Sequence, residues 1–106
     1  MSPTDVKQTI AISSTDTLQK YVGTTATDIG SARLKVIQAQ ASTADASVKI
    51  YDATDATTAS TLVFEAKWGT VANESLTFYL PQNGIRCKTA MHAVLSNCDF
   101  LVVTFD

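Results

Sequence analysis

The residues best suited to covalent or metal chemistry are two cysteines and one histidine near the end of the sequence. Cys87 and Cys98 lie eleven residues apart, and His92, the only histidine, lies between them. These three side chains would leave a tetrahedral zinc ion one ligand short. A catalytic pair needs contact between thiol and imidazole, but strand alternation puts Cys87 inward and His92 outward. We interpret both cysteines as small buried hydrophobes in neighbouring strands, with a cross-strand disulfide as the second alternative and a metal site as the third.

Acidic residues offer a second kind of chemistry. Asp45, Asp52 and Asp55 fall in or beside the same loop, and calcium accepts six to eight oxygen ligands in flexible geometry. A calcium loop usually contains more acids and a glycine, so we interpret these residues as solvated turn aspartates. Glu65 and Glu74 are the only glutamates, and the four glycines are scattered singly, so neither a glycosidase pair nor a phosphate loop is indicated. We therefore expect no enzyme activity and no cofactor.

Aromatic residues are the remaining candidates for recognition. Alternation places Tyr51 and Tyr79 outward, and it places Trp68 in the core. An outward tyrosine can stabilise a sheet as part of a cross-strand pair, anchor a protein contact or stack on a sugar. All three interpretations stay open for Tyr51 and Tyr79.

Composition narrows the class of protein. A chain of 106 residues is expected to form one domain. Charged residues make up only 17%, whereas there are sixteen threonines and fourteen alanines, which gives a surface that is easily desolvated in an assembly. A net charge of −2 without a basic run argues against direct nucleic-acid binding. No apolar stretch approaches the roughly 20 residues that span a membrane, and the polar start MSPTDVKQ predicts no secretory signal.

Alternation of period two predicts short strands along most of the chain. The predicted strands are 9–12, 18–22, 31–41, 44–51, 61–68, 74–80, 85–96 and 99–105. In 31–41, alternation puts Leu34 and Val36 on one face and Ile37 on the other. We expect 31–41 and 44–51 to form a hairpin through Ser42 and Thr43, and 23–30 and 52–60 to be loops.

Eight or nine short strands with turn signals between them predict an all-β fold. We expect an antiparallel β-sandwich, jelly-roll-like, that spans residues 1–106 as a single domain. The first six residues are expected to form a flexible N-terminal arm. They are Met1, Ser2, Pro3, Thr4, Asp5 and Val6.

The second half of the chain resembles small virion structural proteins of tailed phages, of the type that decorates and stabilises the head. The resemblance covers residues 48–106, and the matching elements are VKIYDA, TLVFEAKWG, LPQNGIRCKTAMHAVLSN and the final FLVVTFD. It implies a β-sandwich that decorates or cements a capsid, or caps part of the neck or tail. It implies no catalytic residues.

We therefore expect a virion protein, made in the host cytoplasm, whose partners are its own copies, as a trimer, and the major capsid protein or another virion protein. Tyr51, Tyr79 and the arm 1–6 are the expected interface residues. The alternative is a receptor- or carbohydrate-binding β-module of a tail or fibre.

Overall fold

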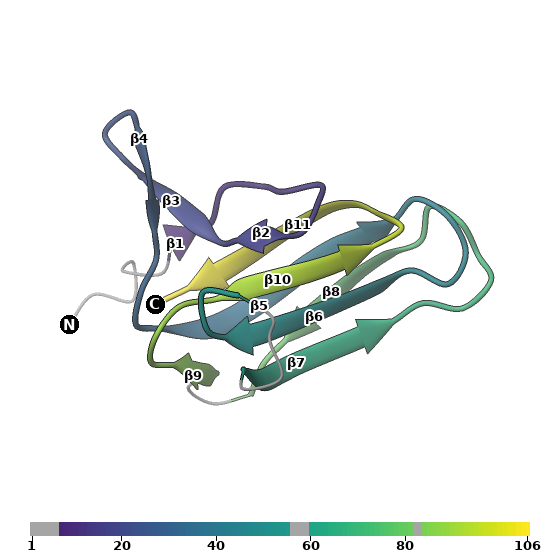
Figure 1. Cartoon of the computed structure of the whole chain (residues 1–106). Coiled ribbons are helices and arrows are strands. Elements are labelled where there is room, and N and C mark those ends of the chain that lie inside the picture. The colour runs from purple at the N-terminus through teal and green to yellow at the C-terminus, as the bar shows by residue number, and fades with distance from the viewer. Residues whose placement is uncertain (1–6, 56–59, 82–83) are drawn as a thin grey trace.

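The computed structural model describes residues 7–55, 60–81 and 84–106. Within them the chain forms eleven β-strands and no helix. The strands build two antiparallel sheets that face each other, and a two-stranded hairpin projects from one end (Figure 1). The predicted all-β antiparallel sandwich is confirmed. In these residues no helix is long and apolar enough to cross a membrane.

Each sheet combines strands from both halves of the sequence. The first has five strands, in the order β1 (Lys7–Gln8), β11 (Cys98–Phe105), β5 (Ala32–Ala41) and β8 (Ser75–Tyr79), with β9 (Ile85–Cys87) pairing the start of β5. The second has four strands, in the order β2 (Asp16–Thr17), β10 (His92–Ser96), β6 (Ser47–Asp52) and β7 (Thr61–Lys67). The projecting hairpin consists of β3 (Gln19–Val22) and β4 (Thr25–Asp28).

The strand order is that of a jelly roll. When β3, β4 and β9 are treated as additions, eight strands remain. If these eight are counted from 1 to 8 in chain order, the order of neighbours is 1-8-3-6 in one sheet and 2-7-4-5 in the other. This pattern of two Greek keys places the two sheets face to face. The jelly-roll expectation is therefore confirmed, although the described residues form more strands than the eight or nine predicted.

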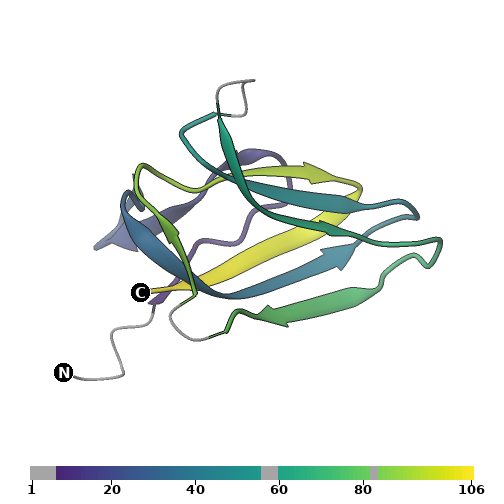
Figure 2. The same ribbon diagram turned by 90° about the horizontal axis from the view of Figure 1, so that it is seen from below.

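The two sheets face each other across the core (Figure 2). The core between them is one cluster of buried side chains. Leu34 and Ile37 from β5, Ile50 from β6 and Leu101 from β11 are fully buried, and each such side chain contributes roughly 1.5–3 kcal/mol to folding. Trp68 is only 6% exposed, which confirms its predicted place in the core.

The predicted hairpin between residues 31–41 and 44–51 is wrong. β5 and β6 belong to different sheets, so the segment between them crosses the edge of the sandwich. The Ser42 N–H donates to the Asn97 carbonyl at 2.8 Å, the Asp45 N–H donates to the Gly69 carbonyl at 2.9 Å, and Asp45 has a φ of 59°. Both strands have one apolar face, and alternation alone cannot tell whether those faces lie side by side in one sheet or opposite each other in two.

Alternation also assigns Ile37 to the wrong face. Leu34 and Ile37 are both fully buried, because the pairing of β5 with β11 skips Lys35 as an extra residue. Such a β-bulge reverses the inward and outward phase of the strand. The pairing of β6 with β7 has a second irregularity, and beside it the Leu62 side chain is 44% exposed.

The predicted loop 23–30 contains a strand. β4 pairs with β3 across Gly23 and Thr24, and Gly23 has a φ of 65°. Threonine is a good strand former, but all four residues of β4 are exposed. The segment therefore lacks the buried apolar alternation by which a strand is recognised in a sequence.

The predicted strand 85–96 is two strands, because β9 and β10 lie in different sheets. Cys87, Met91 and Ala93 are all buried. Just before β9, the Gly84 N–H donates to the Pro81 carbonyl at 3.0 Å. Gly84 has a φ of 75°, and a Cβ there would overlap the Leu34 carbonyl.

Some predicted segments cannot be compared with the structure. The loop 52–60 begins in β6, which ends at Asp52, and its residues 56–59 lie outside the described residues. The same holds for Gln82, Asn83 and the N-terminal arm 1–6.

Candidate protein-contact surface

The two cysteines lie too far apart to act together. Cys87 pairs with Ala32 and Cys98 pairs with Ala41, so they sit at opposite ends of β5, roughly 30 Å apart. Both are buried and free. The expectation of small buried hydrophobes is confirmed, but their strands flank β5 on opposite sides, and the disulfide alternative is wrong.

Neither thiol is prepared for nucleophilic attack. Burial raises the pKa of Cys87 to about 11, with a further contribution from the negative charge of Asp52. Burial also raises the pKa of Cys98, although backbone hydrogen bonds at Ser96 and Ser47 partly oppose it. Because the thiolate is the reactive form, both cysteines are poor nucleophiles at neutral pH.

His92 is separated from both cysteines. It lies on β10 in the four-stranded sheet, whereas Cys87 and Cys98 belong to the five-stranded sheet. Its Nδ1 is 3.0 Å from the Thr17 hydroxyl, which in turn donates to the Thr54 carbonyl at 3.1 Å. The predicted separation of thiol and imidazole is therefore confirmed, and His92 forms part of a polar contact between strands.

The three aspartates do not gather either. Asp45 precedes β6 and Asp52 ends it, which separates them by roughly 20 Å. Across the described ranges, no three histidine, cysteine, aspartate or glutamate side chains come close enough to hold a metal ion. The calcium interpretation has no support from this geometry.

Asp52 has a structural role that the sequence did not reveal. Its carboxylate accepts hydrogen bonds from the backbone N–H groups of Lys88 at 3.0 Å, Thr89 at 2.8 Å and Ala90 at 3.4 Å. Partial burial alone would raise the pKa of Asp52, but these hydrogen bonds and the Lys88 charge outweigh it and lower the pKa. Asp52 thus fixes the segment in which the chain crosses from β9 to β10. Its partners lie 36 or more residues away, so no local pattern could have identified them.

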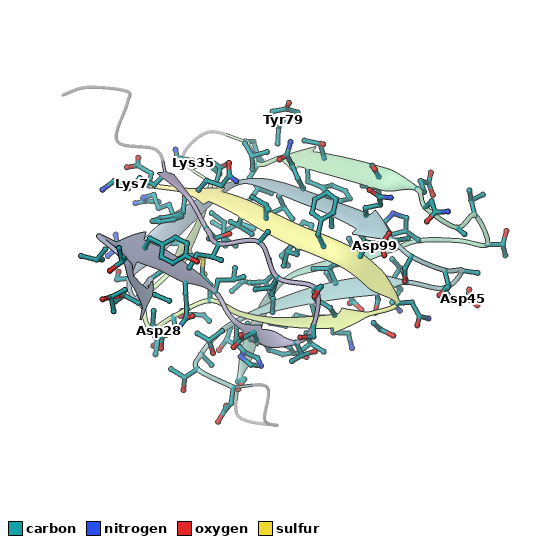
Figure 3. All side chains as sticks on the ribbon, turned by 90° about the horizontal axis from the view of Figure 1, so that it is seen from above. Lys7, Asp28, Lys35, Asp45, Tyr79 and Asp99 are labelled. Carbon is teal, nitrogen blue, oxygen red and sulfur yellow. The ribbon has the colours of Figure 1, made fainter. Side chains whose placement is uncertain are left out.

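The structure places the two predicted interface tyrosines on opposite sides of the sandwich. Tyr79, on β8, is 79% exposed and points away from the molecule (Figure 3). Tyr51 lies on the outer side of the other sheet, half-buried, opposite His92 and Leu62 in the pairing register. They cannot take part in the same flat contact.

The outer surface beside Tyr79 carries no charged side chain over the middle of three neighbouring strands. In the stretch of β5 from Val36 to Gln40 and in the parts of β11 and β8 that pair with it, the residues between the core positions face outward, and they align in cross-strand rows. These residues are Phe100, Val102, Thr104, Gln40, Gln38, Val36, Ser75, Thr77 and Tyr79. We call this surface the uncharged face. It offers amide and hydroxyl groups, aliphatic side chains and two aromatic rings, but no ionisable group other than the Tyr79 phenol.

The outer side of the four-stranded sheet has a different character. It carries Lys49, Glu65 and Lys67 in addition to His92, and we call it the charged face. Glu65 lies 4.0 Å from the Lys49 ammonium and 3.7 Å from that of Lys67. Charged residues are depleted at the centres of protein interfaces and aromatic residues are enriched there. The contrast identifies the uncharged face as the better contact surface.

One hollow is present beside the hairpin, between β1 with the residues that follow it and β3. Its volume is about 450 Å³, and Lys7, Ile10, Lys20 and Tyr21 are among its lining residues. It is wide open, and no histidine, cysteine or acidic side chain lines it.

In comparisons with known proteins, no family model, no curated protein and no solved structure matched the chain.

Proposed function

We propose that this chain is a non-enzymatic structural protein of a phage virion, which decorates the assembled head and stabilises it through protein–protein contacts. The observation that carries the proposal is the uncharged face. An outer sheet surface that includes Phe100 and Tyr79 but no charged side chain costs little to desolvate. The same property is unneeded in a protein that remains free in solution.

The resemblance to virion proteins adds support. The matching segment, residues 48–106, supplies β6 to β11 and hence strands of both sheets. Double-sheet jelly rolls occur in viral capsid proteins and in lectins, so the architecture suits the proposal without choosing between these classes. The lack of charged side chains on the uncharged face favours the virion class.

The proposed mechanism is thermodynamic linkage between binding of this chain and assembly of the shell. A protein that binds only the assembled shell shifts the equilibrium towards the intact particle. Many copies on one particle each add a modest affinity at high local concentration. Self-association, contact with the capsid protein and a bridging N-terminal arm all serve this mechanism.

Co-sedimentation with procapsids of the phage that encodes the chain tests the proposal. We expect saturable binding, a higher dissociation temperature for decorated particles, and weaker binding of the Tyr79→Ala variant. Tyr51→Ala is the matched control, since Tyr51 lies on the charged face. A variant lacking residues 1–6 tests the arm. Absence of binding to procapsids and to mature heads would overturn the proposal.

The exposure of Tyr79 also favours a second candidate, a carbohydrate-binding module of a tail or fibre. A planar ring on an open surface can stack on a sugar. A glycan array separates the two. Specific glycan binding that is lost in Tyr79→Ala, combined with no binding to heads, would establish the alternative.

A further inference from the structure

β8 forms an open edge of the five-stranded sheet. Within the described residues it pairs with β5 on one side and with no strand on the other. Figure 2 shows β8, in green, along the border of its sheet. An open edge presents a row of unpaired N–H and C=O groups that another strand can bind.

The free backbone groups of β8 belong to alternate residues. The Leu80 N–H donates to the Lys35 carbonyl at 2.9 Å. In an antiparallel pair, every second residue bonds to the neighbouring strand, and the residues between them direct their N–H and C=O groups the other way. The outward groups of β8 are therefore those of Ser75, Thr77 and Tyr79, and no described residue bonds to them.

The absence of charge distinguishes β8 from the other edge strands. Proteins commonly protect an open edge with charged side chains, which resist pairing with a further strand. In the part of the chain that the structure describes, every other edge strand carries at least one charged residue. Such residues are Lys7 in β1, Asp16 in β2, Lys20 in β3, Asp28 in β4, Glu65 in β7 and Arg86 in β9. β8 reads SLTFY, and its pairing with β5 has no bulge, so its edge is unprotected.

We propose that β8 binds β8 of a second copy, antiparallel, about a two-fold axis that passes beside Thr77 and is perpendicular to the sheet. This inference deepens the proposed function and rests on it for its role in the virion, because it names how the copies contact each other. Thr77 then lies opposite Thr77 of the second copy, and Ser75 of each copy lies opposite Tyr79 of the other.

The limits of the strand select this register. Pro81, just after β8, has no N–H to donate, and the Glu74 carbonyl, just before it, already accepts the Ala41 N–H at 2.9 Å. The segment free to pair is therefore Ser75–Tyr79, with Thr77 at its midpoint. With the axis at Thr77, every outward N–H of one copy donates to an outward carbonyl of the other. A shifted symmetric register leaves some of these groups unpaired.

The side chains of β8 also match a second β8. Leu76 and Phe78 pack against the core but are only half-buried, and the Phe78 ring contacts the Phe64 ring edge-on, with 5.3 Å between centroids. In the dimer, Leu76 of each copy lies opposite Phe78 of the other and covers its exposed part. On the outer side, the small Ser75 lies opposite Tyr79 and leaves room for its ring.

This complementarity of β8 with itself favours a second copy over a strand of another protein. The contact is isologous, so it closes at two copies, and it consumes the one uncharged edge of each. Because the axis is perpendicular to the sheet, the uncharged faces of both copies point in the same direction. The dimer therefore presents a continuous uncharged face of twice the extent to the head.

The contact is small, which determines how strongly the copies associate. A strand of five residues spans roughly 17 Å, whereas a standard interface covers about 800 Å² of each partner. We therefore expect a weak dimer whose population rises with concentration. Binding to one particle holds the copies at high local concentration and so favours the pairing.

Sedimentation velocity of the purified chain, without virion components, measures the association, and amide hydrogen exchange locates it. We expect an equilibrium between monomer and dimer that high salt does not weaken, because β8 carries no charge that salt could screen. The amides of Ser75, Thr77 and Tyr79 should gain protection as the concentration rises. Those of Leu76 and Phe78, which bond to β5 in both states, should be protected throughout.

Charge substitutions at the axis give the sharpest result. Thr77 is exposed, so Thr77→Lys and Thr77→Glu should both fold, as circular dichroism would verify. Each should weaken the dimer about 5- to 10-fold, because two like charges face each other across the axis. An equimolar mixture should restore association as a heterodimer. Thr25→Lys is the matched control, since Thr25 is an exposed threonine on another edge strand, β4, and it should leave the dimer unchanged.

A monomer at all concentrations, a trimer, or a mixture of the Thr77 variants that fails to associate would overturn the pairing. Protection of Ser75, Thr77 and Tyr79 that develops only with procapsids would also overturn it, because the occupant of the edge would then be a capsid strand. A monomer that still co-sediments with procapsids overturns this inference alone. A dimer that binds no heads overturns the proposed function alone.

Discussion

Asp52 provides a direct test of how the crossing between the sheets is held. Asp52→Asn removes the negative charge and one of the two acceptor oxygens that receive the backbone N–H groups of Lys88, Thr89 and Ala90. Hydrogen bonds to a charged group contribute roughly 1.5–3 kcal/mol when buried. This carboxylate lies near the surface, so we expect a total loss of about 1–2 kcal/mol. For a chain of this size the melting temperature should fall by about 5–10 °C.

The pH dependence gives the sign of the effect. The pKa of Asp52 is lowered in the folded state, so its stabilisation is present above the unfolded pKa and is lost as the pH falls through the folded value. The difference in unfolding free energy between the wild type and Asp52→Asn should be full at neutral pH. It should shrink below about pH 4.

Urea unfolding across this pH range, followed by fluorescence of Trp68, measures the difference. Asp45→Asn is the control, because Asp45 is exposed and its side chain forms no hydrogen bond with a described residue. Asparagine also tolerates the positive φ of this position. Equal stability of Asp52→Asn and wild type at neutral pH, or a difference that persists unchanged in acid, would refute the reasoning.

Three further predictions concern closely packed or buried positions. Gly84→Ala should cost about 3 kcal/mol, because it adds a side chain at positive φ and a steric overlap, whereas Gly69→Ala, in open space, should change the thermal midpoint little. Cys87 and Cys98 should react with a thiol reagent only as fast as the protein opens, since both are buried with raised pKa values; rapid labelling of the folded chain would contradict this. Thr9→Val should cost about 1–3 kcal/mol in urea unfolding, since the 3%-exposed Thr9 hydroxyl accepts a buried N–H from β11; an unchanged midpoint would exclude that role.

The fold class was predictable because alternation survives in most strands. The inward positions of β8 and β10 follow period two, as Leu76, Phe78 and Ala93 show. The outward position of Tyr79 follows from the same periodicity. Errors arose where a bulge shifted the phase at Lys35, and where an exposed strand such as β4 buries no apolar residue.

The contact surface was only partly predictable. The sequence identified Tyr79, but it grouped Tyr79 with Tyr51, which faces the opposite direction. The composition shows that the chain has few charged residues, but it does not show that uncharged outward residues gather on one face. That concentration depends on which strands are neighbours, and β11 and β5 lie far apart in sequence.

By itself, the sequence determines that this chain forms strands with one apolar side, that those sides must be buried against each other, and that few charges remain outside. These properties follow from local periodicity and composition. Only the tertiary structure decides which strands share a sheet, that Asp52 holds the crossing from β9 to β10, and that uncharged outward residues of β11, β5 and β8 gather on one face. The physical reason is that pairing and charge placement depend on contacts between residues distant in the chain, and a strand pattern is compatible with many such pairings.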